Sequence, residues 1–253
     1  MSATAATSRS NGYHVGRAAL EAILDVIYPR HCIGCGEAVD GGRFRWICPA
    51  CELDLYLVRE PSCQTCGYPF FGRVESLRSC VHCQHLDPVF EEGRTLFLHR
   101  GVGRHLIAEM KYRGGLYLIS DIIGLAARYP GMSRYVSGCE IVPVPLHSRR
   151  ERERGYNQSR EIARRMARCF GGRVSDVLER VRDTESQTRL TRRKRLRNMK
   201  KAFAIRPGID LDSRSTYMLV DDVFTTGATL NACATALRRN GAQRIRVQTL
   251  AHG

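Results

Sequence analysis

Eight of the eleven cysteines in this 253-residue chain form four Cys-x-x-Cys pairs between residues 32 and 83. The pairs are Cys32/Cys35, Cys48/Cys51, Cys63/Cys66 and Cys80/Cys83. Twelve residues separate the first two pairs and thirteen separate the last two, a spacing typical of two-pair zinc sites. Zinc binds four thiolates in a tetrahedron, so such a segment can fold without a hydrophobic core of its own.

We expect two structural zinc ions, each bound by consecutive pairs. The ligands would be Cys32, Cys35, Cys48 and Cys51 for one ion, and Cys63, Cys66, Cys80 and Cys83 for the other. An interleaved cross-brace is the alternative pairing. Because all four ligands are protein thiolates, no coordination position is open for catalysis. Disulfides are the competing use of these cysteines, but no secretory signal is visible, and we therefore expect a cytoplasmic protein.

A strand, a turn and a helix near the C-terminus form a candidate phosphate site. Residues 217–220 are apolar and predict a buried strand, and residues 230–239 have the pattern of a helix. Between them lie Asp221 and Asp222, and then the turn Thr225-Thr226-Gly227-Ala228-Thr229. A helix N-terminus presents unpaired N–H groups and the positive end of the helix dipole, which together bind phosphate.

Each residue type in this unit suits a sugar phosphate. Gly227 lets the backbone approach a ligand closely, and the three threonines add hydroxyl groups. Asp221 and Asp222 can accept hydrogen bonds from sugar hydroxyls or hold a hydrated Mg²⁺. A threonine helix cap after a strand end is the alternative explanation. Other phosphate loops do not fit, because the chain contains neither a G-x-G-x-x-G after a strand nor a G-x-x-x-x-G-K-[ST].

From about Phe90 the sequence alternates between strand and helix patterns. We expect strands at 95–98, 139–144, 175–180, 202–205, 217–220 and 245–250, and helices at 103–112, 121–128, 156–170 and 230–239. This alternation predicts an α/β fold with a parallel sheet covered by helices on both sides. Ligands of such sheets bind beyond the carboxyl ends of the strands, so the strand ends near 142 and 221 should face one site. Residues 14–28 predict a short amphipathic helix before the cysteines.

A second candidate phosphate segment follows the strand at 139–144. Two prolines stiffen this turn, and Arg154 with Asn157 and Gln158 can contact a second phosphate group. A surface turn followed by a charged helix start is the alternative, and the sequence favours neither. Lys111 is also notable, because it is the only lysine before Lys194 in a chain dominated by arginine.

The chain is strongly basic, with 40 Lys and Arg against 25 Asp and Glu and a formal charge of +15. Such a charge predicts attraction to nucleic acid or to multiply phosphorylated metabolites. Residues 189–201 are especially basic, and a solvated surface is the ordinary explanation of such a run. Contact with a nucleic-acid backbone is the specific alternative. No stretch approaches the roughly 18 apolar residues of a membrane-spanning helix, and we expect no membrane span.

Residues 217–230 resemble the ribose-5-phosphate-binding signature of the type I phosphoribosyltransferases. The resemblance implies that Asp221 and Asp222 bind the ribose hydroxyls of phosphoribosyl pyrophosphate, with Mg²⁺, and that the threonine-rich turn binds its 5′-phosphate. It also implies a pyrophosphate loop at Val144, Pro145, Leu146 and His147, with Arg154 and Lys111 as further candidates. The basic segment would be the mobile loop that closes over pyrophosphate, carrying Gln187, Arg189, Arg192, Arg193, Lys194, Arg195 and Arg197.

The order of motifs along residues 28–253 resembles one branch, the ComF/GntX family. The motifs are the cysteine block, Lys111-Tyr112-Arg113-Gly114, residues 142–146, 154–158 and 187–198, and the turn at 221–229. The resemblance implies a tail and short helix at 1–30, a double zinc ribbon at 31–90 and a type I phosphoribosyltransferase-like domain at 91–253, with a Rossmann-like parallel sheet. Members are associated with late competence, the handling of incoming single-stranded DNA in natural transformation.

These patterns support three functional hypotheses. As an enzyme, the chain would transfer a ribose 5-phosphate unit to an unidentified acceptor, with Asp221 and Asp222 as the catalytic residues that hold the sugar. As a binding module, it would be a single-stranded DNA-binding competence factor that uses the phosphate turn and arginine-rich surface without turnover. As a regulator, it would sense phosphoribosyl pyrophosphate and act through the ribbons on partners such as other competence proteins.

Overall fold

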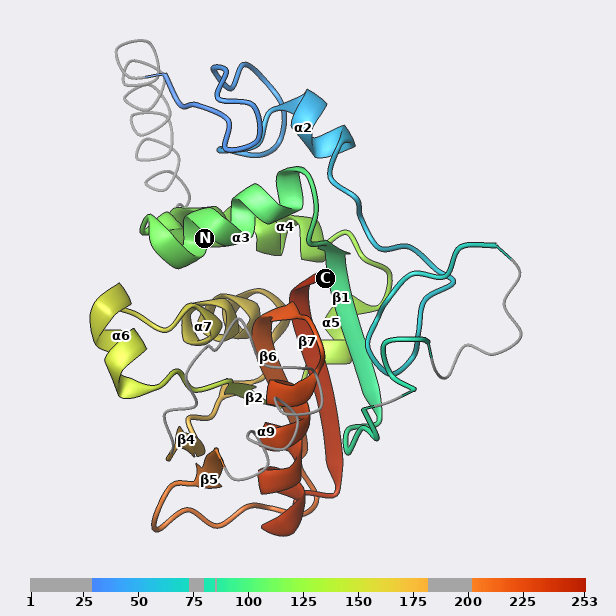
Figure 1. The fold of residues 1–253 in the computed structure, drawn as a ribbon, viewed down its shortest axis with the longest axis vertical. Coiled ribbons are helices and arrows are strands. Elements are labelled where there is room, and N and C mark those ends of the chain that lie inside the picture. The colour runs from blue at the N-terminus through green and yellow to red at the C-terminus, as the bar shows by residue number, and fades with distance from the viewer. Residues whose placement is uncertain (1–28, 73–79, 85, 182–201) are drawn as a thin grey trace, which may run out of the picture.

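A parallel five-stranded sheet forms the centre of the molecule in the computed structural model, which describes residues 29–72, 80–84, 86–181 and 202–253 (Figure 1). The strand order is β1-β7-β6-β2-β3, and every neighbouring pair is parallel. The strands are β1 (Glu92–Leu98), β2 (Glu140–Pro143), β3 (Arg173–Val174), β6 (Thr216–Phe224) and β7 (Arg244–His252). The helix expected at 14–28 and the basic segment at 187–197 lie outside the described residues.

Helices cover both faces of this sheet because its central strand is apolar on both sides. Met218 and Val220 of β6 join one buried cluster, whereas Tyr217 and Leu219 join the other, as the alternation of side chains along a strand requires. The first face is covered by α3 (Val102–Tyr112), α4 (Ile119–Ala126), α5 (Met132–Val136) and α7 (Gln158–Phe170), and the second by α9 (Ala228–Arg239). The chain has the type I phosphoribosyltransferase fold. No helix among the described residues is long and apolar enough to cross a membrane.

One part of the predicted sheet is wrong. The segments at 175–180 and 202–205 do not join the parallel sheet, but form a separate antiparallel pair, β4 (Leu178–Arg180) and β5 (Phe203–Ile205). The place beside β2 is taken instead by β3. Leu178 and Phe203 are buried in the cluster that includes α9, so their apolar pattern reflects packing on that helix and not a place in the main sheet.

Four short helical elements complete the description. They are α2 (Pro49–Leu53), the 3₁₀-helix η1 (Gly115–Leu118), α5 and α6 (Ser148–Arg154), and the sequence predicted none of them. The last of these, α6, connects the end of β2 to α7. Its charged sequence has no buried residue, so it lacks the apolar periodicity from which helices are predicted.

Both cysteine segments pack on the α/β domain rather than standing apart from it. Cys32, Cys48 and Cys51 are buried in the same cluster as α3 and α4, and Figure 1 shows this segment over those helices. Asp121 of α4 accepts hydrogen bonds from the backbone of Arg45 at 3.1 Å and of Trp46 at 2.7 Å. The second segment shares the cluster on the opposite face of the sheet. Each ribbon therefore shares a core with the α/β domain, although zinc alone can stabilise such a segment.

Candidate functional site

The predicted phosphate turn lies between β6 and α9, with boundaries that differ from the expectation. β6 continues to Phe224, so Asp221 and Asp222 lie within the strand rather than after it. The helix begins at Ala228, two residues before the expected start, which places Thr229 in its first turn. The expected break after Val220 is wrong because strand pairing with β7 continues through Asp221 to Phe224, and this pairing outweighs the low strand propensity of aspartate.

Gly227 is required at the point where the turn enters the helix. Its φ of 71° is in the left-handed region, which favours glycine. A Cβ atom at this position would lie 2.5 Å from the Phe224 ring and 2.5 Å from the Leu86 side chain. Thr225 is exposed, and the Thr226 hydroxyl accepts the Ala228 N–H at 3.4 Å. The turn thus presents an open hydroxyl group beside a helix N-terminus.

Asp222 is held by two side chains from other elements. Its Oδ1 pairs with Lys111 Nζ of α3 at 3.0 Å, and its Oδ2 accepts a hydrogen bond from Gln158 Nε2 of α7 at 2.7 Å. The carboxylate is nearly fully buried, with 6% of its side chain exposed. Both of its oxygens are occupied within the protein. The family resemblance makes Lys111 a candidate pyrophosphate ligand. In the structure Lys111 pairs with Asp222, one of the two acids of the site.

Asp221 is placed differently from its neighbour. Its Oδ1 accepts hydrogen bonds from Ser159 Oγ at 3.0 Å and from the Asp222 backbone at 2.9 Å. Among the described residues, no hydrogen-bond partner is found for its Oδ2. Burial, followed by the adjacent Asp222 charge, raises the pKa of Asp221 to about 7, although Lys111 opposes this shift. Asp221 is therefore the carboxyl group of the pair that has an oxygen available for a ligand.

The end of β2 lies beside the acids, as the sequence predicted for the strand ends near 142 and 221. Val144 is buried and donates its N–H to Val220 O of β6 at 3.0 Å. Pro145 is also buried, whereas Leu146 and His147 are half-buried, and the His147 side chain accepts the Arg149 N–H as the cap of α6.

The residues at the end of α6 and just after it divide between structural and site contacts. Arg154 lies over the Tyr112 ring, 5.5 Å from its centroid. Asn157 caps α7 and donates to Val144 O at 3.0 Å, so its polar atoms are used inside the protein. Gln158 contacts Asp222, and its Oε1 is buried without a hydrogen-bond partner in the described residues. The segment positions the acids rather than presenting a row of free phosphate ligands.

The second cysteine segment touches the phosphate turn directly, which the sequence did not predict. Leu86 packs against Gly227, and Asn231 of α9 binds the backbone of this segment with three hydrogen bonds. The ring of His252, at the end of β7, stacks on Phe224 with centroids 4.7 Å apart and contacts Tyr68 at 4.9 Å. No local pattern marks Asn231 or His252, because the second-segment partners of both residues lie more than 140 positions away along the chain.

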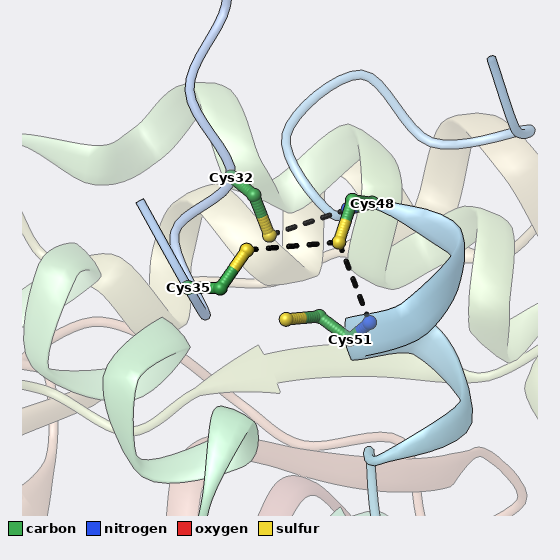
Figure 2. Close-up of side chains that lie close together, drawn as sticks. All are labelled: Cys32, Cys35, Cys48 and Cys51. Carbon is green, nitrogen blue, oxygen red and sulfur yellow. Dashed lines mark hydrogen bonds between the residues drawn. The ribbon is translucent and has the colours of Figure 1, made fainter. Parts of the chain in front are cut away.

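The eight cysteines form two groups in the consecutive order that we expected. In each group the ligand atoms lie within 4.8 Å of one another, and Figure 2 shows the four sulfur atoms of Cys32, Cys35, Cys48 and Cys51 around a common centre. Tetrahedral zinc with bonds of about 2.3 Å separates its sulfur ligands by about 3.8 Å. The distances are 3.8 Å for Cys35 to Cys48 and 3.5 Å for Cys66 to Cys80, so both groups fit zinc.

Backbone N–H groups support the thiolate form in the first group. Gly34 donates to Cys32 Sγ at 3.4 Å and Cys48 donates to the same atom at 3.3 Å. Burial raises the pKa of Cys32, but these backbone hydrogen bonds outweigh it and lower the pKa to about 7. The geometry and the charge stabilisation are those of a structural metal site.

Known proteins resemble both the cysteine-rich segment and most of the chain as a whole. The profile of a double zinc ribbon domain matches residues 23–84. The DNA utilization protein YhgH of Salmonella typhimurium is 30% identical over 210 residues, which cover 81% of this chain and 89% of the relative. The chain belongs to the ComF/GntX family. Competence protein F of Haemophilus influenzae is 26% identical, over 82% of this chain and 97% of the relative. Competence protein ComFC of Bacillus subtilis is 24% identical, over 77% of this chain and 79% of the relative.

Proposed function

We propose that the chain binds phosphoribosyl pyrophosphate, or a related ribose 5-phosphate, together with Mg²⁺. The observation that carries this proposal is the position of Asp221, whose Oδ2 is available beside a glycine-containing turn that opens a helix. The helix N-terminus and the threonine hydroxyls suit a 5′-phosphate, and the carboxylate suits a ribose hydroxyl or a hydrated cation. Mg²⁺ would supply positive charge for the departing pyrophosphate.

The two acids have different roles in this proposal. Asp221 would contact the ribose edge or the hydrated cation directly. Asp222 is a positioning residue, because Lys111 and Gln158 already occupy its two oxygens. Arg154, at the end of α6, would stabilise negative charge on the pyrophosphate side. Positioning and charge neutralisation would then drive transfer to an acceptor base, without a covalent nucleophile.

A thermal-shift titration tests this proposal. Zinc-loaded protein is titrated with phosphoribosyl pyrophosphate in the presence of Mg²⁺, and Asp221→Asn is compared with Asp212→Asn, an exposed acid before β6. Saturation at about 100 times the Kd stabilises the folded state by about 2.7 kcal/mol, a shift of several degrees in Tm. Wild type and Asp212→Asn should show this shift, and Asp221→Asn should lose it. No shift in the wild type would refute the donor site.

Turnover is a separate measurement. If the chain is a phosphoribosyltransferase, pyrophosphate release will require an added nucleobase and will fall in Asp221→Asn. Donor binding with no release for any common base would indicate a sensor or binding protein instead.

We also propose a role in handling incoming DNA, since relatives are named competence and DNA utilization proteins. The formal charge of +15 favours binding to a single strand. Fluorescence anisotropy with labelled oligo-dT over a range of salt concentrations measures this binding. A steep loss of affinity with salt that is unchanged in Asp221→Asn would indicate a DNA surface separate from the ribose-phosphate site. Loss of DNA binding in Asp221→Asn would mean that one site serves both ligands.

A further inference from the structure

A cavity of about 420 Å³ lies along the outer edge of β1, two strands away from the Asp221 site. The linker between the two ribbons forms one wall. Leu98 N–H donates to Tyr56 O at 2.9 Å, Val58 N–H donates to Leu96 O at 2.8 Å, and Gly93 N–H donates to Gln64 O at 2.8 Å, so this segment is hydrogen-bonded to β1 at several points. Arg94 and Thr95 of β1, which lie between these bonds, line the cavity.

The opposite wall is the turn that connects α4 to α5. The lining is largely apolar, from Leu57, Val58, Leu125, Tyr129, Pro130 and Met132. The lining also contains three positively charged residues, Arg59, Arg94 and Arg128, and one negatively charged residue, Glu60. Both carboxylate oxygens of Glu60 already accept hydrogen bonds from Ser62, one from its N–H at 3.0 Å and one from its hydroxyl at 3.2 Å. The cavity is therefore an apolar chamber with excess positive charge.

Two of the three arginines are available to a ligand. Arg94 is occupied, because it lies over the Tyr135 ring at 4.3 Å and donates to Pro130 O. Arg128 pairs with Glu52 through one nitrogen only and remains half-exposed. Arg59 is exposed and makes no ion pair within the described residues. Arg59 and Arg128 line the cavity together with Tyr129. Burial raises the pKa of Tyr129, and the charges of both arginines oppose this rise.

We propose that this cavity binds a nucleoside 5′-phosphate, either free or as the 5′-phosphorylated end of a single DNA strand. The volume is within the range of small-molecule sites, which are mostly apolar with a few placed polar groups. Arg59 and Arg128 bind the phosphate, for which guanidinium groups have matching donors. The base packs on Leu57, Tyr129 and Pro130, the apolar lining residues that are not fully buried. An uncharged ligand would leave the arginine pair uncompensated, and this site is independent of the ribose-phosphate turn.

Isothermal titration of the zinc-loaded full chain with thymidine 5′-monophosphate tests the proposal. The double variant Arg59→Gln/Arg128→Gln should bind at least about ten-fold more weakly, because two charge-assisted contacts are lost. The control is Arg100→Gln, since Arg100 is also an exposed arginine but lies over the Tyr56 ring, outside the cavity lining. This control should bind as the wild type does. In the Asp221→Asn background, where the turn has lost its ligand contact, the double arginine substitution should still weaken nucleotide binding at least about ten-fold. Thymidine without the phosphate should bind at least about ten-fold more weakly to the wild type.

The outcomes separate this site from the phosphate turn. Weaker nucleotide binding in Asp221→Asn, with no change in the double arginine variant, would overturn the proposal by placing the nucleotide at the turn. No binding at millimolar concentration would overturn it as well. Competition identifies the source: displacement of the nucleotide by 5′-phosphorylated oligo-dT, and not by the unphosphorylated strand, would support a strand end. Displacement by neither oligonucleotide, with nucleotide binding still dependent on the arginines, would support a free nucleotide.

Discussion

The contact between the second ribbon and the phosphate turn depends on one side chain, that of Asn231. Its Oδ1 accepts the Val89 N–H at 2.7 Å, and its Nδ2 donates to Leu86 O and to Asp87 O at 3.1 Å each. Three hydrogen bonds at about 1 kcal/mol each, in a partly solvated position, predict that Asn231→Ala lowers the free energy of unfolding by about 2–3 kcal/mol. The Val89 N–H, which is partly buried, would be left without its partner.

Urea unfolding followed by circular dichroism, on zinc-loaded protein, measures this change. Asn240→Ala is the matched control, because Asn240 caps the other end of the same helix and makes a single side-chain bond, to Ala236 O at 2.8 Å. It should lose about 1 kcal/mol or less. If Asn231→Ala costs no more than Asn240→Ala, the three hydrogen bonds do not hold the ribbon on α9, and the reasoning fails.

The same substitution should also weaken ligand binding at the turn. Leu86 packs against Gly227, and its backbone is one of the groups that Asn231 binds. When this contact loosens, the turn samples more conformations, and a ligand must order it at a cost in affinity. We expect Asn231→Ala to show a smaller thermal shift with phosphoribosyl pyrophosphate and Mg²⁺, while Asn240→Ala keeps the shift of the wild type.

Three further predictions concern the site itself. Gly227→Ala should destabilise the protein by roughly 3 kcal/mol in urea unfolding, because of backbone strain and the contacts at 2.5 Å. Gly138→Ala is the control, with a similar φ of 74° but open space around it, and should cost only about 1 kcal/mol. Equal losses would contradict the close packing at Gly227. The pKa of Asp221 is raised to about 7, so the folded protein keeps a proton that the unfolded chain releases near pH 4. The wild type should therefore lose stability relative to Asp221→Asn as the pH rises from about 4 to 7, by up to about 1.4 kcal/mol per pH unit. A stability difference that stays constant over this range would refute the shift. Lys111→Met leaves the buried Asp222 charge without its ion-pair partner and should cost about 2–3 kcal/mol in urea unfolding. Adding Asp222→Asn should recover most of this loss. If the effects of the two substitutions simply add, the pair is not coupled.

The sequence predicted those features that a short segment determines by itself. The spacing of the cysteines gave both groups and their order, because two knuckles joined by twelve or thirteen residues meet most easily as neighbours. Four apolar residues from Tyr217 to Val220, followed by a helix pattern, predicted the position of the turn between β6 and α9 to within a few residues. The end of the strand was missed because pairing with β7 carries Asp221 and Asp222 into the sheet.

Features that depend on distant partners were not predictable in this way. The hydrogen bond from Ser159 to Asp221 joins residues 62 positions apart. The hydrogen bonds of Asn231 to the second ribbon join residues more than 140 positions apart. The pair of β4 and β5 was assigned to the main sheet, since alternation alone does not say which strands pair. Apolar periodicity also fails for α6, whose residues are all solvent-facing or half-exposed.

The two ribbons support opposite faces of the strand that carries the acids. Cysteines of the first group lie in the cluster that includes Val220 of β6, and those of the second group lie in the cluster that includes Leu219 and Phe224. Val102, at the start of α3, lies against this first ribbon, and Lys111, in the last turn of α3, binds Asp222. The second ribbon holds the start of α9. Loss of metal from either group would therefore act on the proposed ribose-phosphate site through a different contact: the first through the positioning of Asp222, and the second through the turn at Gly227.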